Sequence, residues 1–208
     1  MVSQICPRPQ RVPARWVLAA LMLVAGAWRG PNLVRADPTP RCRVRGSHEW
    51  LARRASPLDS VSLIDGSDVA FLCYSRPRAR GRSVYDSLAP FGKAWRTGAN
   101  EPTILELTAP AVVAGVSLPV GRYAILTVPQ PTEWVVLFHT FTTPDSAVDD
   151  LPRVFQTLHE VGRGMMIAKT LPTVTEAFTI RTVADSAGHA FLLEWGTLQA
   201  RMPVHFQY

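Results

Sequence analysis

The chain has 208 residues, of which 47% are apolar, so it is long enough for one domain with a substantial core and short for two. Its formal charge of +6 at first suggests an anionic partner such as nucleic acid. Residues 1–36, however, hold five arginines and no acidic residue, and without those five the 22 basic residues fall to 17 against 16 acidic ones. The remaining charge of +1 provides little long-range field to attract phosphate, so nucleic acid is disfavoured as a partner.

Residues 1–36 have the composition of an export signal. A basic stretch precedes the apolar run 16–27, and helix breakers and a small-residue site ending at Ala36 follow it. The run is too short for a transmembrane helix, which needs about 20 residues. We expect cleavage after Ala36, with cleavage after Ala27 or an uncleaved anchor as alternatives. The sequence therefore predicts a periplasmic or secreted protein with no transmembrane span in the mature chain.

Export also bears on the cysteines. Cys6 lies in the predicted signal, which leaves Cys42 and Cys73 in the mature chain. An even pair in an oxidising compartment predicts a disulfide, although two separate thiols remain the alternative. Closing a loop across the 31 positions that separate them should stabilise the fold by about 3 to 4 kcal/mol on the chain-entropy model.

The segment 37–57 carries three prolines and five arginines with little apolar periodicity, which predicts a loosely ordered linker. From residue 58 to residue 205, short apolar or alternating runs are separated by Gly- and Pro-containing turns, which predicts one all-β domain, mainly an antiparallel β-sandwich. We expect strands over residues 60–64, 69–74, 103–108, 111–116, 122–128, 134–140, 165–170, 176–183, 189–195 and 198–204. The last two should form a hairpin across Gly196 and Thr197.

One segment departs from the strand pattern and predicts a short helix near residues 146–161. Apolar residues recur there at steps of three and four, Ser146 is a plausible N-cap, and Gly162 or Gly164 would end the helix. The apolar positions are Val148, Leu151, Phe155 and Leu158.

Four arginines alternate in the stretch "SRPRARGRS", so in an extended chain their side chains point the same way. Guanidinium groups in such an arrangement suit carboxylate or phosphate, and Arg76 and Arg82 are the candidates we retain. The alternative is a loop rim whose arginines are solvated or paired with neighbours such as Asp86.

Patterns for metal binding or nucleophilic catalysis are missing from the sequence. No two of the five histidines form a close pair, so we expect no metal site and no cofactor. There is no G-x-S-x-G, P-loop or G-x-G-x-x-G motif. His139 is best interpreted as a strand-end histidine.

The most polar stretch is "FGKAWRTGANEPT", residues 91–103. Trp95 can bury a large surface while its N–H donates, and Arg96 can bond carbonyl groups or the carboxylate of Glu101. Gly98 allows a positive φ or a close backbone approach, and Asn100 tolerates the left-handed region. The set could brace an irregular crossover, form a ligand site or act in catalysis.

Three motifs resemble the bacterial exported family called domain of unknown function 2911. They are Y-S-R-P with a following G-R (74–77, 81–82), P-[FY]-G-x-x-W-R-T-G-A-N-E-x-T (90–103), and l-P-x-G-x-Y-x-l (118–126). The resemblance covers about residues 55–205 and implies an exported, β-rich domain with no established reaction, substrate or cofactor. The family often has an asparagine where this chain reads "LFHT", so any polar role there falls to His139 or to no residue.

These observations favour a non-catalytic binding or structural module of the cell envelope. Its ligand could be a small molecule, a glycan or another envelope component. The alternative is a hydrolase whose polar site uses Arg96 and Glu101 with His139, Tyr85 and Asp86.

Overall fold

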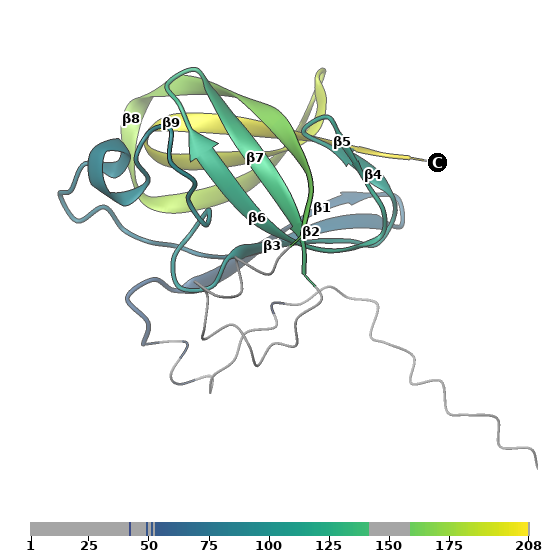
Figure 1. Cartoon of the computed structure of the whole chain (residues 1–208), viewed down its shortest axis with the longest axis horizontal. Coiled ribbons are helices and arrows are strands. Elements are labelled where there is room, and N and C mark those ends of the chain that lie inside the picture. The colour runs from purple at the N-terminus through teal and green to yellow at the C-terminus, as the bar shows by residue number, and fades with distance from the viewer. Residues whose placement is uncertain (1–41, 43–48, 50, 52, 142–158, 208) are drawn as a thin grey trace, which may run out of the picture. The chain divides into compact units, whose positions relative to one another are not determined.

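The computed structural model describes residues 42, 49, 51, 53–141 and 159–207 (Figure 1). They contain nine strands and one short π-helical turn: β1 (Leu58–Asp65), β2 (Asp68–Ser75), η1 (Val84–Leu88), β3 (Thr103–Leu107), β4 (Ala111–Val113), β5 (Val116–Leu118), β6 (Gly121–Pro129), β7 (Glu133–Thr140), β8 (Glu160–Asp185) and β9 (Gly188–Phe206). No helix in these ranges is long and apolar enough to cross a membrane.

Two of the predicted elements fall largely outside the described residues. The export signal at 1–36 lies outside them entirely, and so do residues 146–158 of the predicted helix. The last two residues of that predicted helix, Glu160 and Val161, belong to β8.

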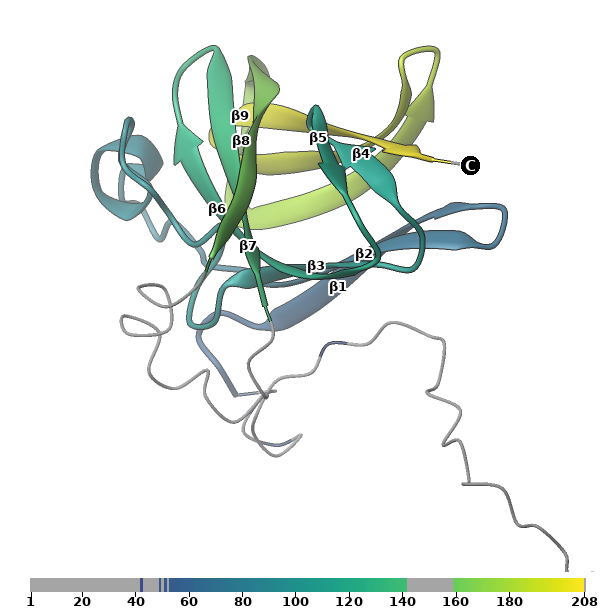
Figure 2. The ribbon, with the colours of Figure 1, turned by 45° about the vertical axis from the view of Figure 1, so that its right-hand side comes forward.

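The all-β, mainly antiparallel fold is confirmed. All nine strands are hydrogen-bonded in one sheet with the order β1-β2-β3-β6-β7-β8-β9-β4-β5, and every pairing is antiparallel. The sheet curls strongly (Figures 1 and 2), so β1, at one end of the order, contacts β8 and β9. Beyond β2, the chain pairs directly with β8: Ala79 N donates to Glu176 O (3.0 Å) and Phe178 N donates to Pro77 O (2.9 Å). One curved sheet thus places opposing strands on either side of a shared core.

The long strands β8 and β9 correct the predicted C-terminal hairpin. The segments expected at 189–195 and 198–204 are one bent strand, β9, and the hairpin turn lies between β8 and β9, at 186–187. Gly196 is a bend and not a turn, because its positive φ (+55°) redirects the strand. A Cβ there would lie 3.2 to 3.3 Å from the side chains of Val84 and Tyr85, so η1 packs directly against the bend.

Alternation along β3 places one face of this strand in the core. Leu105 and Leu107 of β3 are 0% and 2% exposed, while Ile104 and Glu106 of the opposite face are only partly buried. The core is rich in large side chains, which dominate the apolar area that folding removes from water. The largest fully buried ones are Trp134, Trp195, Tyr74, Phe138, Phe178 and Phe191.

Candidate functional site

The polar stretch at 91–103 is anchored in the core by Trp95. Its backbone exchanges two hydrogen bonds with Thr127 of β6, at 2.7 and 2.8 Å. The indole ring stacks on Trp195 of β9 at 5.2 Å between centroids and meets the edge of Phe178 of β8 at 5.0 Å. Because only 9% of Trp95 is exposed, it acts as a core residue that attaches this stretch to three strands.

The turn that follows Trp95 is held by its own hydrogen bonds. Thr97 and Asn100 both adopt the left-handed region, with φ of 57° and 60°. The Thr103 hydroxyl donates to Thr97 O at 2.6 Å, which closes the turn. Gly98 is required by close approach, because a Cβ would lie 3.1 Å from Ser75 O and 3.3 Å from Thr103 Oγ1. The sequence predicted the roles of Gly98 and Asn100 but not the conformation of Thr97.

Glu101 is buried and ion-paired, but its partner is not the one expected. Its carboxylate accepts hydrogen bonds from Arg54 Nη2 at 2.6 and 2.9 Å and from the Ser75 hydroxyl at 2.7 Å. Only 5% of the Arg54 side chain and 10% of the Glu101 side chain are exposed. Of the two kinds of partner that the sequence allows for Arg96, the structure has the carbonyl and not the Glu101 carboxylate: Arg96 is exposed and donates to Asn100 O at 2.7 Å. Two positions of the turn, Thr97 and Asn100, are left-handed, so the chain changes direction between Arg96 and Glu101.

Arg54 belongs to the segment 37–57 that the sequence predicts to be loosely ordered, yet two contacts attach this segment to the domain. The first is the Arg54–Glu101 ion pair. The second is the disulfide predicted between Cys42 and Cys73, whose Cα atoms are 5.3 Å apart. Cys42 Sγ also lies 3.6 Å from Asp59 O, but a bridged sulfur has no proton to donate, so this is a packing contact.

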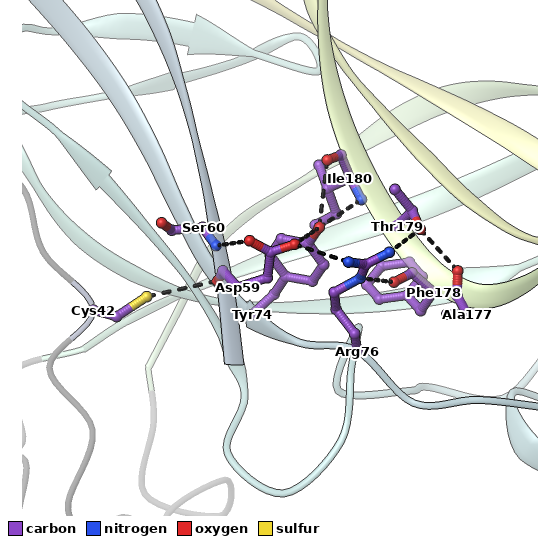
Figure 3. Close-up of polar contacts among 9 residues, drawn as sticks. All are labelled: Cys42, Asp59, Ser60, Tyr74, Arg76, Ala177, Phe178, Thr179 and Ile180. Atoms are coloured by element: carbon purple, nitrogen blue, oxygen red, sulfur yellow. Dashed lines mark hydrogen bonds and ion pairs between the residues drawn. The ribbon is translucent and has the colours of Figure 1, made fainter. Parts of the chain in front are cut away.

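Arg76 joins the end of β2 to β8 (Figure 3). Its guanidinium donates to Phe178 O at 3.2 Å and Thr179 Oγ1 at 2.9 Å, and it lies 3.3 Å from Asp59 Oδ2. Next to it, the Tyr74 hydroxyl accepts from Ile180 N at 3.0 Å, and burial raises the pKa of Tyr74 to about 12. Arg76 therefore stabilises the closure of the curled sheet, and its donors are directed to the protein itself.

Arg82 also bonds within its own loop. Its Nε donates to Ala79 O at 3.0 Å and its Nη2 to Arg78 O at 3.3 Å. The four arginines of the alternating stretch do not form one extended row, because Arg80 has a positive φ of 52° and Arg78 pairs with Ala177 of β8. The geometry favours the loop rim over an anion site for this stretch.

The remaining residues of the hydrolase alternative have separate contacts. The Tyr85 hydroxyl donates to Trp195 O at 2.6 Å, and burial raises its pKa well above the usual range. Asp86 is exposed and accepts from the Ser83 hydroxyl. The side-chain hydrogen bonds of Glu101 within the described residues lead to Arg54 and Ser75, and none leads to Tyr85, Asp86 or His139. In the same ranges no group of three His, Cys, Asp or Glu side chains is arranged to hold a metal ion.

His139 lies near the end of β7, opposite Ala124 of β6 and Glu160 of β8, at a register shift. It is 7% exposed, and its Nδ1 has no hydrogen-bond partner among the described residues. Burial lowers the pKa of His139, and Arg163 and His159 contribute in the same direction, whereas Glu160 opposes them. The structure therefore favours the neutral imidazole.

This environment makes His139 a source of acid sensitivity. The unfolded state, with a histidine pKa of about 6.5, binds a proton more readily than the folded state, so stability falls as pH drops through that value. We expect His139→Gln to reduce the loss of unfolding free energy between about pH 7 and about pH 5, measured by urea denaturation. His205→Gln, at an exposed position, is the matched control. An unchanged pH dependence in His139→Gln would contradict the assignment.

A groove that the sequence did not predict lies on the β8–β9 hairpin. It has a volume of about 450 Å³, within the range of small-molecule sites. Its lining comes from both arms of the hairpin: Ile167, Lys169, Arg181, Val183, Asp185, Leu192, Gln199 and Arg201. The two arms pair directly with each other on either side of the register shifts between Thr170 and Thr179. Alternation alone places these side chains on strands, but only the strand pairing reveals that they share a groove.

Three of the polar side chains that line the groove, Arg181, Gln199 and Arg201, are held by hydrogen bonds. Glu194 is 7% exposed and accepts from Arg181 and from Gln199 Nε2, and its carboxylate raises the pKa of Arg181. Arg201 donates to both carboxylate oxygens of Asp185 at 3.0 Å and to Gly188 O at 2.9 Å. Lys169 is exposed and has no ion-pair or hydrogen-bond partner in the part of the chain that the structure describes.

Comparison with known proteins identifies a family and no characterised relative. Residues 56–204 match the model of the family described as "Protein of unknown function (DUF2911)". Neither the curated proteins nor the solved structures include a match to the chain. The match covers most of the chain and contains the W-R-T-G-A-N-E motif around Trp95. The chain therefore belongs to the DUF2911 family.

Proposed function

We propose that this protein is an exported, non-catalytic binding module of the cell envelope that takes a small ligand in the β8–β9 groove. The observation that carries the proposal is the contrast between two polar regions. The donors and acceptors around Glu101 are directed to Arg54 and Ser75, whereas the groove presents Lys169 and apolar side chains to solvent. A concave surface with a few convergent polar groups is the usual form of a binding site.

Two features support export. Residues 1–36 have the order of a basic, an apolar and a small-residue region that is typical of secretory signals. The disulfide between Cys42 and Cys73 is of a kind that persists in oxidising compartments such as the periplasm.

The structure offers less support for the hydrolase alternative. A catalytic Glu101 would need to meet water or substrate, but its carboxylate is buried and already accepts three hydrogen bonds. His139 and Asp86 make no contact with it among the described residues. We therefore assign the W-R-T-G-A-N-E motif a bracing role in the same proposal.

The proposal can be tested by NMR of the isotopically labelled full chain with a mixed library of neutral sugars, short peptides, organic cations and organic anions. We expect the amide shifts caused by binding compounds to cluster at Lys169, Leu192 and Gln199. Leu192→Trp, which narrows the groove, should abolish them, whereas the surface variant Lys93→Gln should not. Shifts that cluster at Trp95 and Glu101, or no binding by any compound, would contradict the proposal.

A further inference from the structure

We propose that the β8–β9 groove binds an amphipathic monocarboxylate, that is, one carboxylate group attached to an apolar chain. This inference rests on the proposed function and specifies the chemical class of its ligand. It follows from the charge balance of the groove, from the way its donors are held, and from the position of its apolar side chains.

The charge balance favours a single negative charge. Arg181 pairs with Glu194 and Arg201 pairs with Asp185, so these four charges cancel in two pairs. Lys169 is left as the one cation of the lining without a counter-charge among the described residues. A carboxylate carries one negative charge at neutral pH, whereas a phosphate monoester carries about 1.5 to 2. The surplus of one positive charge therefore matches a carboxylate better than a phosphate monoester.

The donors of the groove are preorganised. Glu194 is almost fully buried and holds Arg181 through the Nε and Nη2 atoms of the guanidinium, so that Nη1 remains available to a ligand. The same carboxylate holds Gln199, the neighbour of Lys169 in the strand pairing. A ligand that arrives at Lys169 thus meets side chains that are already in place, which reduces the ordering cost of binding.

The apolar part of the ligand has a surface to cover. Ile167 is 77% exposed at one end of the groove, and Val183 and Leu192 are partly buried along it. On the same face of β8, two residues before Ile167, Met165 is 49% exposed and pairs with Val135 of β7. Side chains at alternate positions of a strand share a face, so the apolar surface continues from the groove toward β7.

The position of Lys169 fixes the direction of the ligand. Lys169 follows Ile167 by two residues on the same face of β8. Glu133 lies opposite Ile167 on β7, so its negative charge is beside Ile167 and one diagonal step from Lys169 in the register. We infer that the carboxylate contacts Lys169 and the Nη1 atom of Arg181, while the chain extends over Ile167 toward Met165.

The test is a series of NMR titrations of the full chain, read at the amides of Lys169, Leu192 and Gln199 so that binding elsewhere is not counted. The probes are acetate, hexanoate, octanoate, octanol, octylammonium and octyl phosphate, each below its micelle concentration. We expect no groove shifts with acetate and an affinity gain of about fourfold for each added methylene from hexanoate to octanoate. Octanol and octylammonium should bind at least about tenfold more weakly than octanoate, because neither supplies a charge opposite to Lys169.

Matched variants separate the two parts of the ligand. Lys169→Gln should weaken the binding of octanoate about tenfold and leave the affinity for octanol unchanged. Ile167→Ser should reduce the gain in affinity for each added methylene. Lys93→Gln, which removes an exposed lysine in the 91–103 stretch, is the control. It should change neither the affinity for octanoate nor the gain for each added methylene. Thermal unfolding of each variant should remain that of the wild type, because both Lys169 and Ile167 are exposed.

Each remaining outcome overturns a defined part of the proposal. If octanol or a neutral sugar binds in the groove as tightly as octanoate, the groove is a site but the anionic class is wrong. If octyl phosphate binds more tightly than octanoate, the head group is a phosphate and the carboxylate assignment is wrong. If Lys169→Gln binds octanoate like the wild type, Lys169 is not the anchor. If no probe and no library compound shifts the groove amides, the proposed function falls as well.

Discussion

Replacing Glu101 with glutamine is expected to lower the free energy of unfolding by about 3 kcal/mol, because it removes the carboxylate from a buried ion pair. The charge that loses this carboxylate is the guanidinium of Arg54, whose side chain is 5% exposed. The Ser75 hydroxyl, which donates to Glu101 and is itself fully buried, would have to bond an amide in place of a carboxylate. Both effects act on the same buried contact. The loss of unfolding free energy should therefore be much larger than the loss caused by removing a surface charge.

The measurement is chemical denaturation of the wild type and the variant, with Glu49→Gln as the matched control. Glu49 pairs with Arg53 on the surface, with 73% and 77% of their side chains exposed, so its loss should cost about 0.5 kcal/mol or less. A double variant, Arg54→Met with Glu101→Leu, removes both charges and should recover part of the lost stability. A cost for Glu101→Gln as small as that of the control would show that the pair does not brace the motif.

The second large effect is expected from the disulfide. Cys42→Ala should lower the free energy of unfolding by about 3 to 4 kcal/mol on the chain-entropy model, because the unfolded chain regains the freedom of the opened loop. The bridge spans 31 positions and attaches the segment that also carries Arg54. Loss of the bridge should therefore also weaken the Arg54–Glu101 pair, because Arg54 is then held by fewer constraints.

Denaturation with and without a reducing agent checks this prediction. Reduction should destabilise the wild type by a similar amount and should have no effect on the double variant Cys42→Ala, Cys73→Ala. Thiol titration of the denatured full chain should find one reactive thiol, that of Cys6. Three reactive thiols, or a wild type whose stability is unchanged by the reducing agent, would contradict the prediction.

Local patterns in the sequence predicted much of the fold. Apolar runs and side-chain alternation identified β1, β2, β3, β6 and β7 to within two residues at each end. In β3 the two faces alternate between buried and partly buried, whereas residues 70–74 of β2 are buried on both faces. The disulfide followed from counting cysteines, and the DUF2911 family followed from the W-R-T-G-A-N-E motif. These features depend on neighbouring residues or on residue type, which are visible without a structure.

Continuity and curvature of the sheet could not be predicted in this way. The segments 165–170 and 176–183 have separate strand patterns, yet they form one strand that bends through a region of irregular pairing. The pattern around Gly196 and Thr197 equally suits a turn and a bend. The packing of η1 against Gly196 decides for the bend, because that contact would be lost if the chain reversed there.

The sequence by itself predicted that this chain is β-rich, carries one bridged cysteine pair and resembles the DUF2911 family, and all three predictions are confirmed. Only the tertiary structure decided which charges meet. Arg54 lies 47 residues from Glu101, and Lys169 and Arg201 reach one groove from different strands. Such contacts depend on the curvature of the sheet and on the register in which its strands pair. Neither the curvature nor the register can be read from the residues of a single strand. In the motif that dominates the sequence, Glu101 is thus buried against Arg54, while the groove lies on the long β8–β9 hairpin.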